Sequence, residues 1–216
     1  MNNIFTYCLD CANIDSIKEG LEYYPLHEFS MNPSIVKHDL DGKDIAFFDA
    51  VNAIRDVIGE EVRFHVQTVG DNAEDIIKDA KAIRSHIKGD KLQVKVNCFH
   101  EGYKAMKYLK AHGYNVTATA IASVTQAITA IECGADTVAV YVGRLDNVSG
   151  DGIEVVRGIR QIMNARNITN VELSAASIRT AHQVEQAALA GADQAAVSLD
   201  ILKACANHPL TDNSVK

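Results

Sequence analysis

The chain has 216 residues, of which 47% are hydrophobic and 23% are charged, and these fractions are ordinary for a folded globular protein. Thirteen glycines and three prolines are too few for a collagen-like or disordered chain. The net charge of −7, with no cluster of basic residues, argues against binding to nucleic acid or to an anionic membrane surface. A chain of this length buries roughly 70% of its unfolded surface, so it needs no disulfide or metal for stability.

The first residues and the cysteines predict a cytoplasmic protein with neither metal nor cofactor. Residues 1–5 lack the basic and apolar regions of a signal peptide, and no apolar run approaches the ~20 residues of a membrane span. Five cysteines are an odd number, and most lie in apolar segments, as reduced buried cysteines do. Cys8 and Cys11 match the C-x-x-C pattern, but Cys8 falls within a predicted strand and no second pair completes a zinc site. The eight histidines show no metal-binding spacing.

Strand-like and helix-like segments alternate along the whole chain. Runs rich in Val, Ile and Thr predict eight strands, at residues 5–10, 28–32, 62–69, 92–97, 115–121, 137–142, 170–176 and 194–199. Between them, amphipathic segments predict about eight helices, of which the clearest are residues 14–23, 43–58, 73–87, 102–111, 124–133, 153–165 and 181–190. Gly113, Gly134 and Gly191 follow three of these segments, where a helix favours a left-handed residue.

This alternation predicts an α/β fold with parallel strands and right-handed crossovers. Eight such units favour a closed barrel. An open doubly wound sheet has fewer strands and a glycine-rich turn after the first strand, whereas residues 9–13 contain no glycine. We therefore predict that residues 1–216 form a single (β/α)8 TIM barrel domain.

A barrel enzyme builds its site at the C-terminal ends of the strands. The polar residues that the sequence places at these ends are Asp10, Asn32, Gln67, Lys95, Thr119, Tyr141, Arg144, Ser177 and Arg179. A purely structural core has no need of so many polar side chains at one end, so these residues are the candidates for a functional site.

Lys95 lies in the middle of a predicted strand, between Val94 and Val96. Alternation turns the two valines toward the helices and Lys95 into the barrel. A confined interior disfavours the ammonium form of a lysine and exposes the amine lone pair as a nucleophile. Such an amine forms a Schiff base with a ketone, and the protonated imine accepts electrons when an adjacent carbon–carbon bond breaks. The alternatives are a lysine that extends to the barrel mouth and a core ion pair with Asp10.

Imine chemistry needs groups that move protons. Asp10 and Tyr141 are suitable side chains for this task, and Gln67 and Thr119 are suitable to hold a water molecule. The alternative for these residues is polar packing between the layers of the barrel. Asn32 is suited to hold a substrate hydroxyl, because its amide both donates and accepts, but it equally suits the end of a strand and the start of a turn.

Arg144 and Arg179 follow the sixth and seventh predicted strands, a region of the barrel mouth that often binds phosphate. The arginine fork suits phosphate oxygens, and Ser177 adds a hydroxyl donor. Two arginines beside a site in an acidic protein favour a phosphorylated substrate. The alternative is that each arginine pairs with a surface acid such as Asp146.

Two further features are given structural interpretations. His65 shares the inward parity of Gln67 and is predicted to be a residue of a lower barrel layer. The glycines of Gly150-Asp151-Gly152 are predicted to relax a loop, and the segment to cap the helix that follows.

At these positions the sequence resembles the short transaldolases, and within them the fructose-6-phosphate aldolases. The resemblance covers nearly the whole chain and is carried by Asp10, Asn32-Pro33-Ser34-Ile35, Val94-Lys95-Val96, residues 139–146 (AVYVGRLD) and residues 175–180 (AASIRT). It implies a class I aldolase barrel with Lys95 as the Schiff-base lysine and with Asp10 and Asn32 as its polar partners. It further implies a catalytic water held by Gln67, Thr119 and Tyr141, and a phosphate held by Arg144, Ser177 and Arg179.

Two positions separate the branches of this family. Fructose-6-phosphate aldolases carry glutamine where Gln67 stands, whereas true transaldolases carry glutamate. Tyr141 also matches the aldolases, because classical transaldolases have phenylalanine there. An amide and a phenol position water differently from a carboxylate, so the resemblance implies an enamine that is protonated and released as dihydroxyacetone rather than passed to an aldose.

The sequence also departs from the family pattern. Ser30 and Met31 replace two threonines before Asn32, and Asn97 replaces a proline that usually follows Lys-Val. Members of the family end in a helix that reaches over a neighbouring subunit of a pentamer or decamer, and the tail after Pro209 is shorter here than most of that helix requires. We expect a homo-oligomer without assuming exchange of tails.

The sequence thus predicts a cofactor-free class I aldolase that reversibly cleaves fructose 6-phosphate to dihydroxyacetone and glyceraldehyde 3-phosphate. The alternative enzyme is a transaldolase that moves a dihydroxyacetone unit between sugar phosphates. A further alternative is a barrel that binds sugar phosphates without catalysis, although such a protein needs no buried amine.

Overall fold

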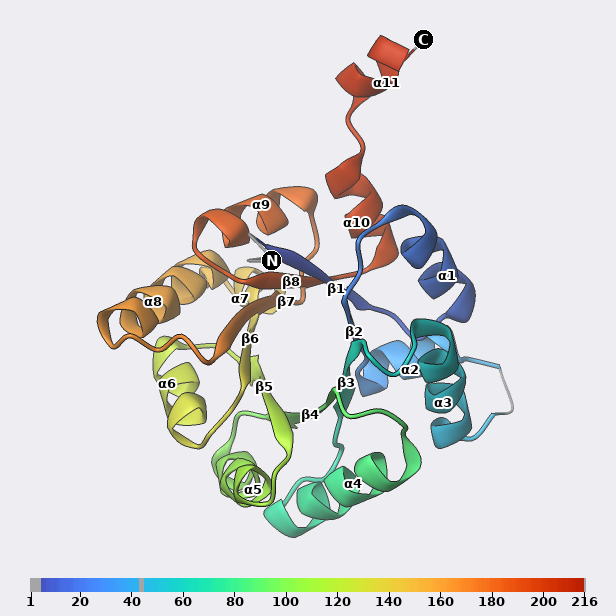
Figure 1. The fold of residues 1–216 in the computed structure, drawn as a ribbon. Helices are drawn as coiled ribbons and strands as arrows, with labels where there is room; N and C mark the ends of the chain where they lie inside the picture. Colours follow the sequence, from blue (N-terminus) through green and yellow to red (C-terminus); the bar gives the residue numbers. More distant parts are fainter. Residues whose placement is uncertain (1–4, 43–44, 216) are drawn as a thin grey trace.

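In the computed structural model, which describes residues 5–42 and 45–215, eight strands form a closed barrel with helices around it (Figure 1). The strands are β1 (Thr6–Asp10), β2 (Glu28–Ser30), β3 (Arg63–Gln67), β4 (Leu92–Asn97), β5 (Asn115–Ile121), β6 (Thr137–Tyr141), β7 (Glu172–Ala176) and β8 (Gln194–Val197). Each strand pairs in parallel with its neighbours in chain order, and β8 pairs with β1. The predicted (β/α)8 TIM barrel is therefore confirmed.

Eleven helices occur within the residues that the structure describes. They are α1 (Ile14–Tyr23), α2 (Pro33–Asp39), α3 (Phe47–Ile58), α4 (Ala73–His86), α5 (His100–Ala111), α6 (Val124–Glu132), α7 (Val142–Asp146), α8 (Gly152–Ala165), α9 (Ala181–Leu189), α10 (Leu199–Ala206) and α11 (Pro209–Val215). The helix predicted over residues 43–58 begins only at Phe47, and residues 43 and 44 lie outside the described residues. None of the described helices has both the length and the apolar character that a membrane span requires.

Four of these helices are absent from the sequence prediction. For α2, Asn32 caps the first turn and Pro33 occupies its first position, so the segment interpreted as a turn is a helix start. For α10, Ser198 caps the helix through its Oγ and ends β8 at Val197, two residues earlier than predicted. The other two, α7 and α11, have five and seven residues, too few to show a helical period.

The C-terminal helix α11 projects away from the barrel, beyond α10 (Figure 1). It begins at Pro209 and has seven residues. A short helix therefore forms in the tail, which the sequence predicts to be too short for most of the terminal helix of the family. Its Leu210 and Val215 are exposed.

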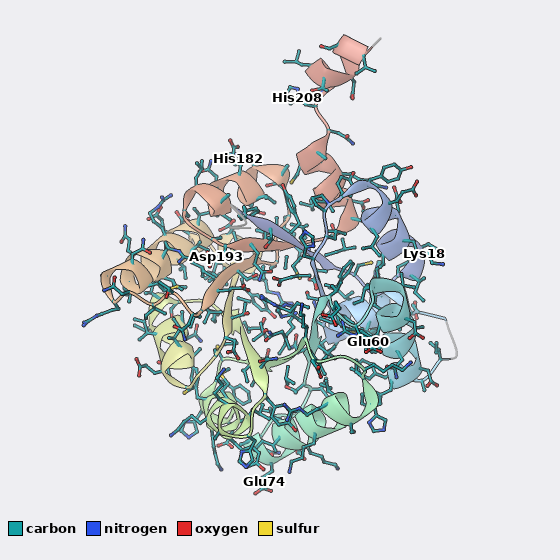
Figure 2. All side chains as sticks on the ribbon, in the orientation of Figure 1. Lys18, Glu60, Glu74, His182, Asp193 and His208 are labelled. Carbon is teal, nitrogen blue, oxygen red and sulfur yellow. The ribbon has the colours of Figure 1, made fainter. Side chains whose placement is uncertain are left out.

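Side chains alternate between the inside of the barrel and the helices. On β4, Val94 and Val96 are fully buried in the core between strands and helices, whereas Lys95 lines the interior cavity. The predicted orientation of Lys95 is thereby confirmed. Side chains also fill much of the space that the strands enclose in the ribbon drawing (Figure 2).

The lower part of the barrel interior contains a hydrogen-bonded polar layer. The Glu28 carboxylate accepts hydrogen bonds from His65 Nε2 and from Gln194 Nε2, each at 3.0 Å, and His65 Nδ1 lies 2.8 Å from the Thr117 hydroxyl. Arg63 forms an ion pair with the second oxygen of Glu28, at 3.0 Å. His65 is thus a residue of a lower barrel layer, as its parity predicts.

Burial lowers the pKa of the His65 imidazole, and this outweighs the opposing effect of the Glu28 carboxylate. Burial also opposes ionisation of Glu28, but the hydrogen bond from His65 and the charge of Arg63 outweigh it and lower the pKa of Glu28. The folded protein therefore holds a neutral imidazole beside an ionised carboxylate.

We predict that stability falls as the pH drops from 7 to 5. Below about pH 6.5 the unfolded chain protonates His65 while the folded protein resists it, so unfolding binds a proton. His65→Gln should lower overall stability but reduce this pH dependence by on the order of 1 kcal/mol in thermal melts at the two pH values. The control is His182→Gln on the exposed face of α9, which should keep the parent slope. Equal slopes in all three proteins would contradict the assignment.

Candidate functional site

A cavity of about 680 Å³ opens at the C-terminal end of the barrel. The residues that line it come from the barrel interior, from the C-terminal strand ends and the loops that follow them, and from α1, α2, α7 and α10. It brings together eight of the nine predicted site residues, namely Asp10, Asn32, Lys95, Thr119, Tyr141, Arg144, Ser177 and Arg179. Gln67 is the exception, because it does not line this cavity.

Lys95 lies inside this cavity with only 8% of its surface exposed. Its Nζ donates a weak hydrogen bond to the Met31 carbonyl oxygen, at 3.4 Å. Among the described residues no carboxylate lies within ion-pair distance of the amine, so the predicted alternative of a core ion pair with Asp10 is not what the structure contains. The amine also stays within the barrel, which disfavours the alternative of a lysine that extends to the mouth.

Asp10 ends β1 and is oriented by the neighbouring strand. The Ser30 hydroxyl donates a hydrogen bond of 2.5 Å to Asp10 Oδ1. Ser30 is one of three residues that depart from the family pattern, and it still supplies a hydroxyl at this place. Met31, a second departure, buries its side chain among the helices and contributes only its carbonyl oxygen to the site.

Asn32 caps a helix and also borders the cavity. Its Oδ1 accepts hydrogen bonds from the backbone N–H groups of Ser34 and Ile35, at 3.0 and 3.1 Å, and so caps α2. The residue also lines the cavity. Because the cap uses Oδ1, the Nδ2 group is left as the donor for a ligand.

Gln67 is held beside the site by the neighbouring strand. Its Nε2 donates to Asn97 Oδ1 at 3.2 Å, and its Oε1 is buried with no partner among the described residues. A proline at position 97, usual in the family, has no side-chain acceptor for this bond. The structure therefore leaves Thr119 and Tyr141 on the cavity wall and turns Gln67 toward Asn97.

Thr119 lies at a break in the regular pairing of β5. The register between β5 and β6 shifts between Ala118 and Ile121, and Ala120 has a φ of 59°. A positive φ strains a residue other than glycine, and such strain often accompanies functional sites. The side chain of Thr119 is 1% exposed, and its hydroxyl forms no hydrogen bond within residues 5–42 and 45–215.

The other side of the mouth brings two loops into close contact. Gly143 in α7 packs against the loop after β7, and a Cβ at this position would lie 2.2 Å from the Ser177 carbonyl oxygen. Ser177 itself has a φ of 59°, and its Oγ is buried with no partner among the described residues. The small residue at position 143 thus allows the helix of Arg144 to approach the loop of Ser177 and Arg179.

Both predicted phosphate-binding arginines are exposed at this mouth, and neither forms an ion pair in the described part of the chain. The Arg144 guanidinium lies 4.4 Å from the centre of the Tyr141 ring. Asp146, the acid considered as their alternative partner, accepts instead from the Gly152 backbone N–H at 3.0 Å and from Gln183 at 2.6 Å. The two cations therefore remain available to an anionic ligand.

The thiols of the C-x-x-C cysteines are not activated for redox chemistry. Cys8 lies inside the barrel, and burial raises the pKa of its thiol well above the ordinary value. Burial likewise raises the pKa of Cys11 to about 11.

Cys8 and the hydrogen-bonded pair of Glu28 and His65 bring three potential metal ligands within 4.8 Å of one another. The pair is nevertheless engaged with itself, and Arg63 neutralises the carboxylate.

Sequence reasoning missed the direct roles of three residues around the site. The sequence marks Ser30 and Asn97 only as departures from the family pattern, although strand alternation places both on the inner face. Lys203 of α10 also lines the cavity, and the sequence gives no signal for it because the pattern does not predict α10.

Comparisons of the sequence with known proteins point to one family. Residues 7–216 match the sequence profile of the family described as transaldolase/fructose-6-phosphate aldolase. The chain is 35% identical to a probable fructose-6-phosphate aldolase of Streptococcus pneumoniae, over 97% of this chain and 92% of that protein. It is 33% identical to a probable transaldolase of Brachyspira hyodysenteriae, over 97% and 94% respectively.

A solved structure described as native KDPGal superposes on 91% of this chain and 82% of its own, with a TM-score of 0.60 and 15% identity. At this identity the likeness concerns the fold alone. The sequence matches go further, because they extend over nearly the full length of the chain and of its relatives. The chain therefore belongs to the transaldolase/fructose-6-phosphate aldolase family.

Proposed function

We propose that this protein is a class I aldolase that reversibly cleaves fructose 6-phosphate to dihydroxyacetone and glyceraldehyde 3-phosphate. The observation that carries the proposal is Lys95, a buried lysine without a carboxylate partner among the described residues, inside a cavity that is open to substrate. Its amine contacts only a backbone carbonyl oxygen and faces the space in which a ketone would bind, which is the position that a Schiff-base nucleophile requires. A barrel that only binds sugar phosphates gains nothing from this arrangement.

In the proposed reaction, the Lys95 amine adds to the C2 carbonyl of the ketose, and the carbinolamine loses water to form an iminium ion. A base then removes the proton of the C4 hydroxyl, the C3–C4 bond breaks, and its electron pair flows into the iminium to form an enamine. The aldehyde leaves, C3 of the enamine is protonated, and water hydrolyses the resulting iminium to release dihydroxyacetone.

Three polar residues on the cavity wall are of the right type for these proton transfers. Asp10, whose carboxylate is oriented by Ser30, is assigned to carbinolamine formation and loss of water. The phenol of Tyr141 and the unpartnered hydroxyl of Thr119 are assigned to the water that moves the C4 hydroxyl proton. Asn32 Nδ2 is assigned to a substrate hydroxyl.

The phosphate is assigned to Arg144, Arg179 and the Ser177 hydroxyl. Charge-assisted hydrogen bonds from guanidinium groups are strong and suit phosphate oxygens. The absence of protein counter-ions for either arginine in the described residues supports this assignment, as does the buried, unpartnered Oγ of Ser177.

A transaldolase is the second candidate, because several relatives carry that name. Gln67 and Tyr141 favour the aldolase. Gln67 is a neutral amide already bound to Asn97, so it lacks the charge with which a carboxylate at this position would act as a base.

We also infer that the chain is a single catalytic domain and that it forms a homo-oligomer. The exposed Leu210 and Val215 of the projecting α11 are suited to contact another subunit.

Borohydride should trap the Schiff base. In the presence of dihydroxyacetone or fructose 6-phosphate, reduction should increase the intact mass by one dihydroxyacetone less one oxygen atom, because the imine loses water and gains two hydrogens, and the added group should be on Lys95. Lys95→Met should abolish this adduct and lower kcat/KM by at least about a thousandfold, because the nucleophile is lost. Lys91→Met, at the exposed residue just before the same strand, should retain both. An adduct that survives Lys95→Met would refute the assignment.

Dependence on an acceptor distinguishes the two candidate enzymes. An aldolase should release free dihydroxyacetone from fructose 6-phosphate alone, at a rate that erythrose 4-phosphate does not raise. A transaldolase should consume fructose 6-phosphate only when that aldose is added. Coupled assays of dihydroxyacetone and glyceraldehyde 3-phosphate, with and without the acceptor, measure the difference.

Arg179→Ala should raise KM for glyceraldehyde 3-phosphate about tenfold to a hundredfold, because it removes a charge-assisted hydrogen bond. KM for unphosphorylated glyceraldehyde should change little. Arg179 is a cleaner test than Arg144, which also stacks on Tyr141. The exposed Arg166 offers a matched control, Arg166→Ala. Equal effects on the phosphorylated and unphosphorylated aldehydes would show that Arg179 does not bind the phosphate.

A further inference from the structure

The cavity that contains Lys95 continues downward into the barrel. Its walls include a second set of inward residues, nearer the N-terminal ends of the strands than the site residues. We call the space they enclose the lower chamber, lined by Cys8, His65, Thr117, Thr137, Ser174 and Gln194. Barrel interiors are usually filled at this level by large branched apolar side chains, so a polar chamber here is unusual.

Small side chains open the passage between the site and the lower chamber. Ala139, Ala176 and Ala196 form a buried cluster with Cys8, and Tyr141 packs against it. These alanines lie on β6, β7 and β8, on the side of the barrel that faces Lys95 on β4. Two residues of a tilted strand span about 5 Å along the barrel axis, which is enough for one or two further carbon atoms.

The chamber presents hydroxyl groups that lack protein partners. Thr137 and Ser174 are 1% and 4% exposed, and their hydroxyls form no hydrogen bond within residues 5–42 and 45–215. Because both residues line the cavity, water or a ligand inside it can form the hydrogen bonds that the protein does not supply. By contrast, Thr117 and Gln194 are bound to His65 and Glu28. The hydroxyls of Thr137 and Ser174 therefore line the sides of the lower chamber, and the hydrogen-bonded side chains of Thr117 and Gln194 form its floor.

We propose that the lower chamber receives a hydroxylated carbon on the far side of the carbonyl that reacts with Lys95. The enzyme then accepts donor ketones longer than dihydroxyacetone and acts on phosphorylated ketoses with their carbonyl at C3 as well as at C2. This proposal rests on the aldolase function proposed above. The orientation of the bound ketose follows from its phosphate, which Arg144 and Arg179 hold at the mouth of the barrel. The carbon that forms or breaks the bond therefore faces the mouth, and the other arm of the ketone faces the lower chamber.

Erythrulose, a four-carbon ketone, is the simplest probe. The Lys95 amine adds to its C2 carbonyl and water is lost, giving an iminium ion, and loss of a proton from C1 gives the enamine. C1 then forms a bond with the aldehyde carbon of glyceraldehyde 3-phosphate, whose oxygen takes up a proton. Water hydrolyses the new iminium and frees the amine. The product is a seven-carbon 3-ketose 7-phosphate, and the remaining arm of erythrulose occupies the chamber throughout.

The first experiment compares dihydroxyacetone with both enantiomers of erythrulose. Borohydride trapping should give an erythrulose adduct on Lys95 that is heavier than the dihydroxyacetone adduct by one CHOH unit. With glyceraldehyde 3-phosphate, kcat/KM for one enantiomer should fall within about tenfold of that for dihydroxyacetone. A dihydroxyacetone adduct without an erythrulose adduct overturns this proposal and leaves the aldolase intact. Absence of both adducts overturns the aldolase itself.

The second experiment assigns the selectivity to the chamber. Thr137→Val keeps the side-chain volume and removes one hydroxyl, so the ratio of kcat/KM for erythrulose over dihydroxyacetone should fall about fivefold. Ser174→Val adds volume and should lower the ratio at least about tenfold. Thr6→Val on β1, which lines a separate cavity at the opposite end of the barrel, is the matched control and should leave the ratio unchanged. Equal ratios in the parent and both chamber variants would overturn the proposal, with thermal melts confirming that each variant is folded.

Discussion

The parallel pairing of β8 with β1 is the constraint on which the rest of the molecule depends. Closure leaves no free sheet edge and confines every second side chain of each strand to a narrow interior. On β4 this alternation sends Val94 and Val96 into the core beneath the helices and leaves Lys95 no direction except inward. The inward position of Lys95, on which the proposed chemistry depends, thus follows from strand geometry and not from any particular neighbouring side chain.

The partners of the polar interior groups decide which of them remain reactive. In the floor, Glu28 is satisfied by Arg63, His65 and Gln194, so its charge is not directed at the amine above. Asp10 is held by Ser30, and the amine of Lys95 contacts a backbone carbonyl instead of a carboxylate. At the mouth, Asp146 is occupied by neutral donors. An amine and two guanidinium groups are therefore left without protein counter-ions among the described residues, and they face one cavity.

The departures from the family pattern have physical consequences that differ from one residue to the next. Ser30 keeps the hydroxyl that orients Asp10, and Met31 places its side chain outside the barrel, so both preserve the local arrangement. Asn97 is different, because its side chain accepts a hydrogen bond from Gln67 and holds that amide away from the cavity wall. The change at position 97 therefore bears on the placement of the Gln67 amide, whereas the changes at 30 and 31 leave the local arrangement intact.

The sequence by itself determined the barrel, its eight strands and the inward direction of Lys95, because these follow from hydrophobic period and strand alternation, which are local properties. It also identified eight residues that line one cavity, since parallel strands bring their C-terminal ends to one face. Only the tertiary structure decided which polar groups are paired. Two examples are the hydrogen bonds between Gln67 and Asn97 and between Asp146 and Gln183. The depth of the chamber beneath Lys95 is a third, and in each case the residues involved are far apart in the chain. No period or spacing encodes such contacts, because they depend on the register and tilt with which the barrel closes.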